Sequence, residues 1–212
     1  MKSSLLAIFS DSSKSLKDTR TLATTGIMLA MALVLRGLSV QVTEDIRIVF
    51  SFVPICIIGM LYGPAVCAMA NVSLDIIGFI IDTKSARGYS PQLSLLSVAV
   101  GLMYGFILYK RSSLKPCKSD ILRIFIARLA VVVICNVLVR SYLMYTMYVN
   151  PDFSLFSGDT GMMQAFMIYL QPRIIKSAVE FPIDIVILTV TLPVALQAYS
   201  RTVNRLGSRK NS

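Results

Sequence analysis

Four charged side chains are spaced along a mainly apolar segment near the end of the chain. They are Arg173, Lys176, Glu180 and Asp184, within the stretch QPRIIKSAVEFPIDIVILTVTLP. Spacings of three, four and four residues place all of them on one stripe of a helix, and Lys176 and Glu180 have the spacing of an i, i+4 ion pair. The stripe has two interpretations that do not exclude each other: its charges neutralise one another, or they contact a charged ligand.

Four further ionisable side chains interrupt apolar runs elsewhere. They are Arg36, Asp75, Arg128 and Arg140. Each such group costs about 2.5 to 3.5 kcal/mol at the centre of a bilayer, so it is expected to be paired, to reach the headgroups or to serve a function. We predict a ligand-binding role for Arg36 and Asp75, with contact to the headgroups as the alternative for Arg36. For Arg128 we predict packing or headgroup contact, and Arg140 remains open.

Catalytic chemistry has few candidate groups in this sequence. Histidine is absent, which removes the commonest general base and metal ligand, and no nucleophile elbow, P-loop or H-E-x-x-H motif occurs. A carboxylate-based membrane transferase would rely on Asp75 and Asp82, which are seven residues apart and lack a further acidic cluster to hold metal ions. We therefore predict that the chain is not an enzyme and carries no cofactor.

The four cysteines do not form a metal-binding or redox pattern. Cys56, Cys67, Cys117 and Cys135 include no C-x-x-C pair, and three of them fall within apolar stretches. We predict free thiols that serve as small hydrophobic side chains.

The composition places these charges in a membrane protein. Of 212 residues, 55% are hydrophobic and 15% are charged, against the ~25% charged residues of soluble domains, and the mean hydropathy is +0.71. The net charge of +10 does not indicate a nucleic-acid partner, because the positive residues gather outside the apolar runs. No linker divides residues 1–212, which predicts a single all-α membrane domain.

Six apolar runs are near the ~20 residues that a spanning helix needs. They lie at about 22–40, 46–62, 64–81, 91–109, 121–149 and 173–199. Gly63 and Pro64 predict a tight turn between the second and third runs, with the proline in the first turn of the next helix. Between the fifth and sixth runs, GMMQAFMIYL is too short to cross, and we predict a short extracellular helix there.

Lysine and arginine residues are distributed unequally between the two sides, which predicts the orientation. Thirteen lie on one side: Lys2, Lys14, Lys17, Arg20, Lys110, Arg111, Lys115, Lys118, Arg123, Arg201, Arg205, Arg209 and Lys210. Five lie on the other: Arg47, Lys84, Arg87, Arg173 and Lys176. The positive-inside rule then places both termini in the cytoplasm. In this topology Arg36, Asp75, Arg173 and Lys176 converge on a pocket that opens outward.

The first forty residues add two expectations. The stretch MKSSLLAIFSDSSKS has too short an apolar core for a cleaved signal peptide and predicts an amphipathic helix on the membrane surface. In the first span, Ala23, Gly26 and Ala30 are three and four residues apart, a small-residue stripe that lets another helix approach closely. Internal packing and a partner helix both remain open for it.

Four stretches carry a resemblance to a known family. They are IRIVFSFVPICIIGMLYGPAVCA at 46–68, DIIGFII at 75–81, GLMYGFILYK at 101–110 and PRIIKSAVEFPIDIVIL at 172–188. In order and in span count, the chain resembles the substrate-binding S component of an energy-coupling factor (ECF) vitamin transporter over about residues 18–200. The folate-specific branch is the most similar. Its members usually carry a Gly-Pro-aromatic-Gly loop between the third and fourth spans, where this chain has DTKSARGYSPQL, residues 82–93.

The resemblance implies a six-helix protein of a prokaryotic plasma membrane that captures a vitamin outside the cell. It also implies partners, namely one transmembrane coupling protein and two cytosolic ATPase subunits. Docking on them would use the small residues Ala23, Gly26 and Ala30. The lack of a P-loop agrees with ATP hydrolysis in those partners.

The chemistry of folate suggests a role for each charged residue. A pterin edge offers an N–H and an amino group side by side, which the carboxylate of Asp75 would accept in bidentate fashion. The two carboxylates of the glutamate tail suit arginine and lysine, so Arg36, Arg173 and Lys176 would meet them near the mouth. Glu180, on the same stripe, completes the predicted substrate-binding set.

Three other functions remain open at this point. The first is an S component for another water-soluble vitamin such as riboflavin or pantothenate. The second is a secondary transporter or channel, and the third is a membrane anchor without a ligand. For a secondary transporter we expect inverted repeats or broken helices, and no internal repeat is evident.

Overall fold

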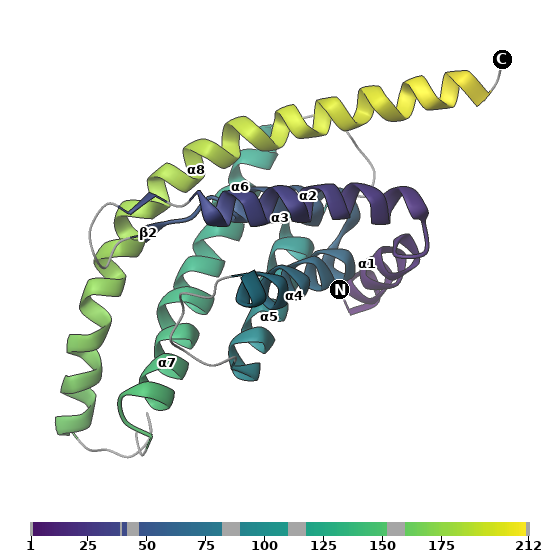
Figure 1. Ribbon diagram of the computed structural model, residues 1–212. Helices are drawn as coiled ribbons and strands as arrows, with labels where there is room; N and C mark the ends of the chain where they lie inside the picture. Colours follow the sequence, from purple (N-terminus) through teal and green to yellow (C-terminus); the bar gives the residue numbers. More distant parts are fainter. Residues whose placement is uncertain are drawn as a thin grey trace.

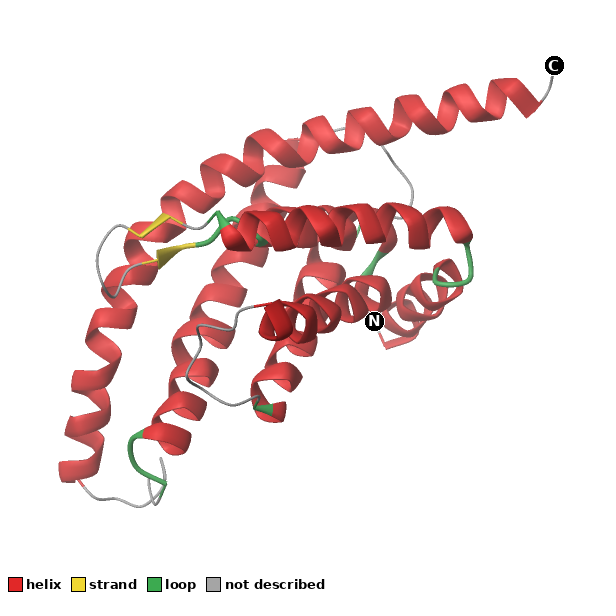
Figure 2. Ribbon diagram, viewed as in Figure 1, coloured by secondary structure: helices red, strands yellow, loops and turns green. Residues whose placement is uncertain are grey.

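The computed structural model describes residues 2–38, 40–41, 47–81, 90–109, 118–151 and 160–210. Within these ranges the chain consists of helices, the loops and turns that join them, and two paired two-residue strands (Figures 1 and 2). The elements in chain order are α1 (Lys2–Ser15), α2 (Thr19–Gly37), β1 (Val40–Gln41), β2 (Arg47–Ile48), α3 (Phe52–Tyr62), α4 (Pro64–Ile81), α5 (Pro91–Leu108), α6 (Lys118–Ala130), the π-helix η1 (Val131–Val139), α7 (Arg140–Tyr148) and α8 (Thr160–Lys210).

Helix length and composition agree with a membrane protein and give four or five candidate spans. α4, α5, the continuous helix over Asp120–Tyr148 and α8 are each long and apolar enough to cross a bilayer. α1 and α2 together make a fifth candidate, with a bend of 87° between them. The predicted N-terminal helix is therefore present as α1, and Asp18 caps α2 by accepting a hydrogen bond from the Arg20 N–H at 3.3 Å.

The predicted second span, 46–62, is wrong in its extent. The chain is extended at Arg47–Ile48 and becomes helical only at Phe52. The 11 residues of α3 reach about 16 Å, against a hydrocarbon core of about 30 Å. Nearly every side chain of α3 is buried, so its uniform hydrophobicity reflects a position inside the bundle.

The predicted turn between α3 and α4 is confirmed. Gly63 has a φ of +85°, a conformation that favours glycine, and Pro64 begins α4, where its missing N–H costs nothing. Ser12 of α1 closes the turn: its hydroxyl donates to the Tyr62 carbonyl at 2.7 Å and accepts from the Ala65 N–H at 3.0 Å. This contact anchors α1 to the bundle.

α4 and α5 cross closely because glycines remove the side chains between them. A Cβ at Gly101 would lie 2.7 Å from the Cα of Ala68, and a Cβ at Gly105 would overlap Pro64. Gly101 and Gly105 form a G-x-x-x-G motif, which lets two helices approach backbone to backbone in a membrane.

α8 corrects the prediction of a separate short helix before the last span. It is one helix of 51 residues that includes Pro172, Pro182 and Pro193, and Figure 1 shows it as a long curved helix along the bundle. Prolines inside a helix bend it. The first part of α8 continues as helix because Phe166 and Leu170 are buried against Tyr145 of α7, which stabilises those turns by packing.

Candidate functional site

The charged stripe lies on the inward face of α8. The same face continues with the buried residues Leu188, Leu192 and Leu196 at four-residue spacing, whereas Val186, Val190 and Val194 on the opposite face are exposed. The stripe therefore faces the other helices rather than lipid, and the inward face of α8 is polar in its first half and apolar in its second.

The deepest charge of the stripe, Asp184, is paired with Arg128 of α6. Asp184 is 2% exposed and Arg128 is 8% exposed. The Arg128 Nε and Nη2 groups donate to Asp184 Oδ2 at 3.0 Å and 2.5 Å, Nη1 donates to the Tyr104 hydroxyl at 2.5 Å, and the guanidinium lies 4.2 Å from the centre of the Phe52 ring. Four helices, α3, α5, α6 and α8, meet at this cluster.

This arrangement decides between the two interpretations of Arg128. The side chain does not reach for the headgroups, because three helices and a carboxylate enclose it. Arg128 packs internally, and sequence reasoning missed its partner because Asp184 is 56 residues away.

The middle of the stripe forms the predicted ion pair. Lys176 Nζ and Glu180 Oε1 are 3.7 Å apart, and the two side chains are 32% and 21% exposed. Glu180 Oε1 is buried and accepts no hydrogen bond within the part of the chain that the structure describes. The pair therefore neutralises charge without satisfying that oxygen.

Asp75 on α4 is oriented by a serine of α5. The Ser94 hydroxyl donates to Asp75 Oδ2 at 2.6 Å. Ser90, which precedes α5, and Ser94 and Ser97 of α5 are buried, and the same face of the helix continues with Gly101 and Gly105 of the α4 crossing. This spacing of small polar residues in an apolar helix is a signal that sequence reasoning missed.

Arg36 of α2 lies against α4 at Leu74 and Gly78. Its Nη1 group donates to the Leu74 carbonyl at 3.4 Å. A Cβ at Gly78 would lie 2.6 Å from the Arg36 Cζ, so the absent side chain at Gly78 makes room for the guanidinium. Arg36 therefore packs against α4 over Leu74 and Gly78, and its predicted role with Asp75 in a ligand site stays a prediction.

Arg173 of α8 is held by neutral groups at the start of the stripe. Its Nη2 donates to the Tyr169 hydroxyl at 2.6 Å, its Nη1 to the Ser141 hydroxyl at 3.5 Å, and its guanidinium lies 4.7 Å from the centre of the Tyr169 ring. Arg173 is within electrostatic range of Arg140, and so are Arg36 and Asp75. Arg140, left open by the sequence, therefore belongs to the same charged group.

These charged residues are described as two groups. We call Arg36, Asp75, Arg140 and Arg173, from α2, α4, α7 and α8, the upper charged group. Lys176 and Glu180 form a pair of their own one turn further along α8. Among the residues that the structure describes, no three cysteine, aspartate or glutamate side chains come together as a metal site.

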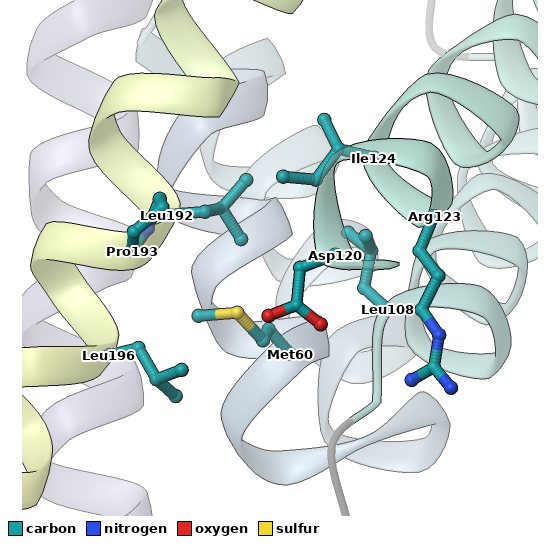
Figure 3. A pocket seen from close by; sticks show the side chains of 8 residues that line it. All are labelled: Met60, Leu108, Asp120, Arg123, Ile124, Leu192, Pro193 and Leu196. Atoms are coloured by element: carbon teal, nitrogen blue, oxygen red, sulfur yellow. The ribbon is translucent and has the colours of Figure 1, made fainter. Parts of the chain in front are cut away.

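A small hollow lies at the opposite end of α8, away from the upper charged group. Figure 3 shows Met60, Leu108, Asp120, Arg123 and Ile124 around it, with Leu192, Pro193 and Leu196 of α8. Its volume of about 20 Å³ accommodates about one water molecule. It is too small for a vitamin.

The predicted partner stripe on α2 is exposed. Ala23, Gly26 and Ala30 all lie on the surface, and a Cβ at Gly26 meets nothing within 4 Å. The stripe is therefore not occupied by another helix among the described ones, which disfavours the internal-packing interpretation.

Several predictions fall outside the described residues. They concern Asp82, Lys84, Arg87, Lys115, Cys117 and most of the loop 82–93. Cys56, Cys67 and Cys135 are buried free thiols.

Comparison with known proteins gives a consistent result. The chain is 26% identical over 153 residues to the folate transporter FolT of Clostridium novyi (strain NT), covering 72% of this chain and 76% of that protein. It is 25% identical over 168 residues to the folate transporter FolT of Leuconostoc mesenteroides subsp. mesenteroides, covering 79% and 82%.

The fold is also similar to that of a solved structure. The crystal structure of FolT bound with folic acid matches with a TM-score of 0.62 and 25% identity, over 81% of this chain and 92% of that one. A model of the family described as ECF transporter, substrate-specific component, matches residues 20–192. The chain therefore belongs to the family of substrate-specific components of ECF transporters.

Proposed function

We propose that this chain is the folate-binding S component of an ECF-type importer, which captures folate outside the cell and delivers it through an energising module. The observation that carries the proposal is the upper charged group: Asp75 accepts a hydrogen bond from Ser94, Arg36 bonds the neighbouring Leu74 carbonyl on α4, and Arg173 of α8 bonds Ser141 beside Arg140. Folate presents both donors for a carboxylate and carboxylates for cations. The names of the similar proteins support the same ligand.

The geometry suggests how the ligand is oriented. Asp75, oriented by Ser94, accepts the paired donors of the pterin. Arg36, Arg173 and Lys176 meet the glutamate tail, and Glu180 keeps the Lys176 ammonium in place through the pair on α8. In this orientation the charged stripe of α8, from Arg173 to Glu180, forms one wall of the vitamin site.

Delivery requires partners that this chain does not provide. We propose that α2 docks on a transmembrane coupling protein through Ala23, Gly26 and Ala30, because this surface is small, exposed and open. Two cytosolic ATPase subunits complete the module. The chain itself contains no P-loop and has no enzymatic role in this proposal.

The proposed topology has six crossings with both termini in the cytoplasm of a prokaryotic cell. α2, α3 with the segment before it, α4, α5, the helix from α6 to α7, and α8 supply the six. The support is the excess of lysine and arginine on the side of both termini.

Titration with two ligands tests the assignment of the residues. Folic acid and pteroic acid, which lacks the glutamate tail, are titrated against the wild-type chain and the variants Asp75→Asn, Arg173→Ala and Lys176→Ala. Asp75→Asn should weaken both ligands by roughly tenfold to a hundredfold, because an amide has one acceptor where the pterin needs two.

The other two variants test the orientation. Arg173→Ala and Lys176→Ala should weaken folic acid and leave pteroic acid nearly unchanged. Equal losses for both ligands would refute the orientation, and an undiminished affinity in Asp75→Asn would remove the pterin assignment. Saturable binding of riboflavin or pantothenate in place of folic acid would make the chain an S component for that vitamin.

A further inference from the structure

The charged stripe of α8 lies on a part of the helix that has little packing of its own. Within the described stretch 171–183 no residue is buried, whereas Leu170 before it and Asp184 after it are 6% and 2% exposed. Phe181 does contact Phe125 of α6, with ring centres 5.4 Å apart, but both residues are at least partly exposed. The rotation of this stretch about the helix axis is therefore not fixed by a buried apolar face.

Two prolines lie at the ends of this stretch. Pro172 and Pro182 are inside α8, and each lacks the N–H that would donate to the carbonyl four residues earlier. Helices bend at such positions because the hydrogen-bond ladder is interrupted. The turns between the prolines, which carry Arg173, Lys176 and Glu180, therefore bend and rotate more easily than those of an uninterrupted helix. Side-chain contacts close to each proline determine their direction.

The buried pair of Asp184 and Arg128 lies directly beside the second proline. Asp184 follows Pro182 by two residues, and the Arg128 Nε and Nη2 groups both donate to its Oδ2 atom, at 3.0 Å and 2.5 Å. Arg128 is fixed in turn by the Tyr104 hydroxyl of α5 and the Phe52 ring of α3. Hydrogen bonds are directional, whereas apolar contact is not. The pair therefore holds α8 at one rotation just past the proline.

The pair and the charges further up the helix share one stripe. Lys176, Glu180 and Asp184 follow one another at four-residue spacing, and α8 remains helical through Pro182, so a rotation set at Asp184 is passed on to the other two. Side-chain tips lie about 5 to 6 Å from a helix axis, so a rotation of about 20° moves them by about 2 Å. A shift of that size breaks a hydrogen bond, whose length varies by only about 0.5 Å.

We propose that the Arg128–Asp184 pair is a positioning device for the ligand site: it sets the rotation of α8 that presents the Lys176 ammonium, held by Glu180, to the tail of folate. The inference rests on the proposed function, in which Lys176 meets that tail. Arg128 and Asp184 touch no ligand themselves. Apolar residues of similar volume often replace a buried ion pair without loss of stability, but they cannot replace its direction.

The test separates ligand preference from stability. Wild type and the double variant Arg128→Met with Asp184→Leu are titrated with folic acid and pteroic acid, and their melting temperatures are measured without ligand. The double variant should melt close to wild type. It should nevertheless bind folic acid about tenfold more weakly and pteroic acid nearly as the wild type does, because only the tail meets Lys176.

Asp184→Asn should give the opposite result. Both Arg128 bonds go to a single oxygen, and one amide oxygen accepts two hydrogen bonds, so the direction is kept while the compensating charge is lost. This variant should melt below wild type and keep its preference for folic acid over pteroic acid.

Arg128→Lys keeps the charge and loses the direction, because a single ammonium replaces the planar fork of the guanidinium. It should lose part of the preference for folic acid. Size-exclusion profiles report whether each variant is folded, and Arg128→Lys decides the question if the double variant does not fold.

Leu192→Ala is the matched control for lost stability. Leu192 is buried on the same face of α8, eight residues after Asp184, and truncating a buried leucine destabilises a protein without removing a polar contact. This variant should melt below wild type with its preference unchanged.

The outcomes separate this inference from the proposed function. A wild-type preference in the folded double variant, or in folded Arg128→Lys, overturns the inference alone, and so does a lost preference in folded Asp184→Asn. Equal affinities of the wild-type chain for folic acid and pteroic acid remove the proposed orientation and the inference with it. Failure of the wild-type chain to bind folic acid overturns the proposed function itself.

Discussion

Replacing Asp184 with leucine should destabilise the protein strongly, because it leaves the Arg128 guanidinium buried without its carboxylate. Two N–H groups of Arg128, at 3.0 Å and 2.5 Å from Asp184 Oδ2, would lose their acceptor. The Tyr104 hydroxyl and the Phe52 ring would remain, but neither carries a negative charge. Breaking a buried ion pair by removing one partner costs about 3 to 5 kcal/mol. At about 2 to 4 °C per kcal/mol for a chain of this length, the melting temperature should fall by about 10 °C.

The assay is a thermal melt of the purified protein in one detergent at fixed salt, without ligand. The double variant Arg128→Met with Asp184→Leu should recover most of the loss, since replacing both partners of a buried pair by apolar residues is often neutral. Lys176→Met is the control for loss of an ion pair as such: its pair with Glu180 spans 3.7 Å and is partly exposed, so little change is expected. A melting temperature of Asp184→Leu equal to that of wild type would show that the carboxylate of Asp184 is not needed to stabilise the buried Arg128. A double variant no more stable than the single one would show that apolar side chains cannot replace the pair.

Three further predictions address the ligand site, the partner surface and the topology. Gly78→Ala should weaken the binding of folic acid by about tenfold, because the new methyl group displaces the Arg36 guanidinium. The control Gly26→Ala, where a Cβ meets nothing within 4 Å, should bind folic acid normally. Equal affinities of the two variants would place Arg36 outside the site. Gly26→Leu or Ala30→Leu should leave binding intact and abolish uptake into cells, since a bulky side chain keeps the coupling helix away; lost binding with normal association with the module would show internal packing instead. A cysteine at position 84 should be labelled in intact cells and one at position 115 only after the membrane is opened, and the reverse pattern would discard the topology.

Much of the helical architecture follows from hydrophobic run length and turn residues, as the Gly63–Pro64 turn and the extents of α4 and α5 illustrate. The length of an apolar run does not predict the extent of a membrane span where the segment is buried inside the bundle, because burial and a lipid environment select the same residues. α3 is such a segment, and its extended entry at Arg47–Ile48 has no clear signal in the apolar run. The prediction of a separate short helix at the start of α8 was wrong for a related reason. The stretch GMMQAFMIYL is too short to cross a membrane alone, but it is the beginning of a longer helix that packs on α7.

The site was partly predictable because charged residues in apolar runs are few. Helical spacing identified Lys176 with Glu180, and cost in the membrane identified Arg36 and Asp75. Pairing between distant helices was not predictable: the partner of Arg128 depends on the relative rotation of α6 and α8 rather than on local spacing. The direction in which the Arg140 side chain leaves the helix depends on the preceding π-helix η1. The sequence of η1, VVVICNVLV, contains no turn-forming or helix-breaking residue from which a π-helix could be predicted.

Mass spectrometry of the small molecules released by denaturing the purified, unsupplemented protein identifies the ligand that the chain binds. We expect a folate species in near-stoichiometric amount from the wild-type chain, and a clearly smaller amount from Asp75→Asn purified in parallel. Release of a different vitamin, or of no small molecule from wild-type protein that had been incubated with folic acid before purification, would contradict it.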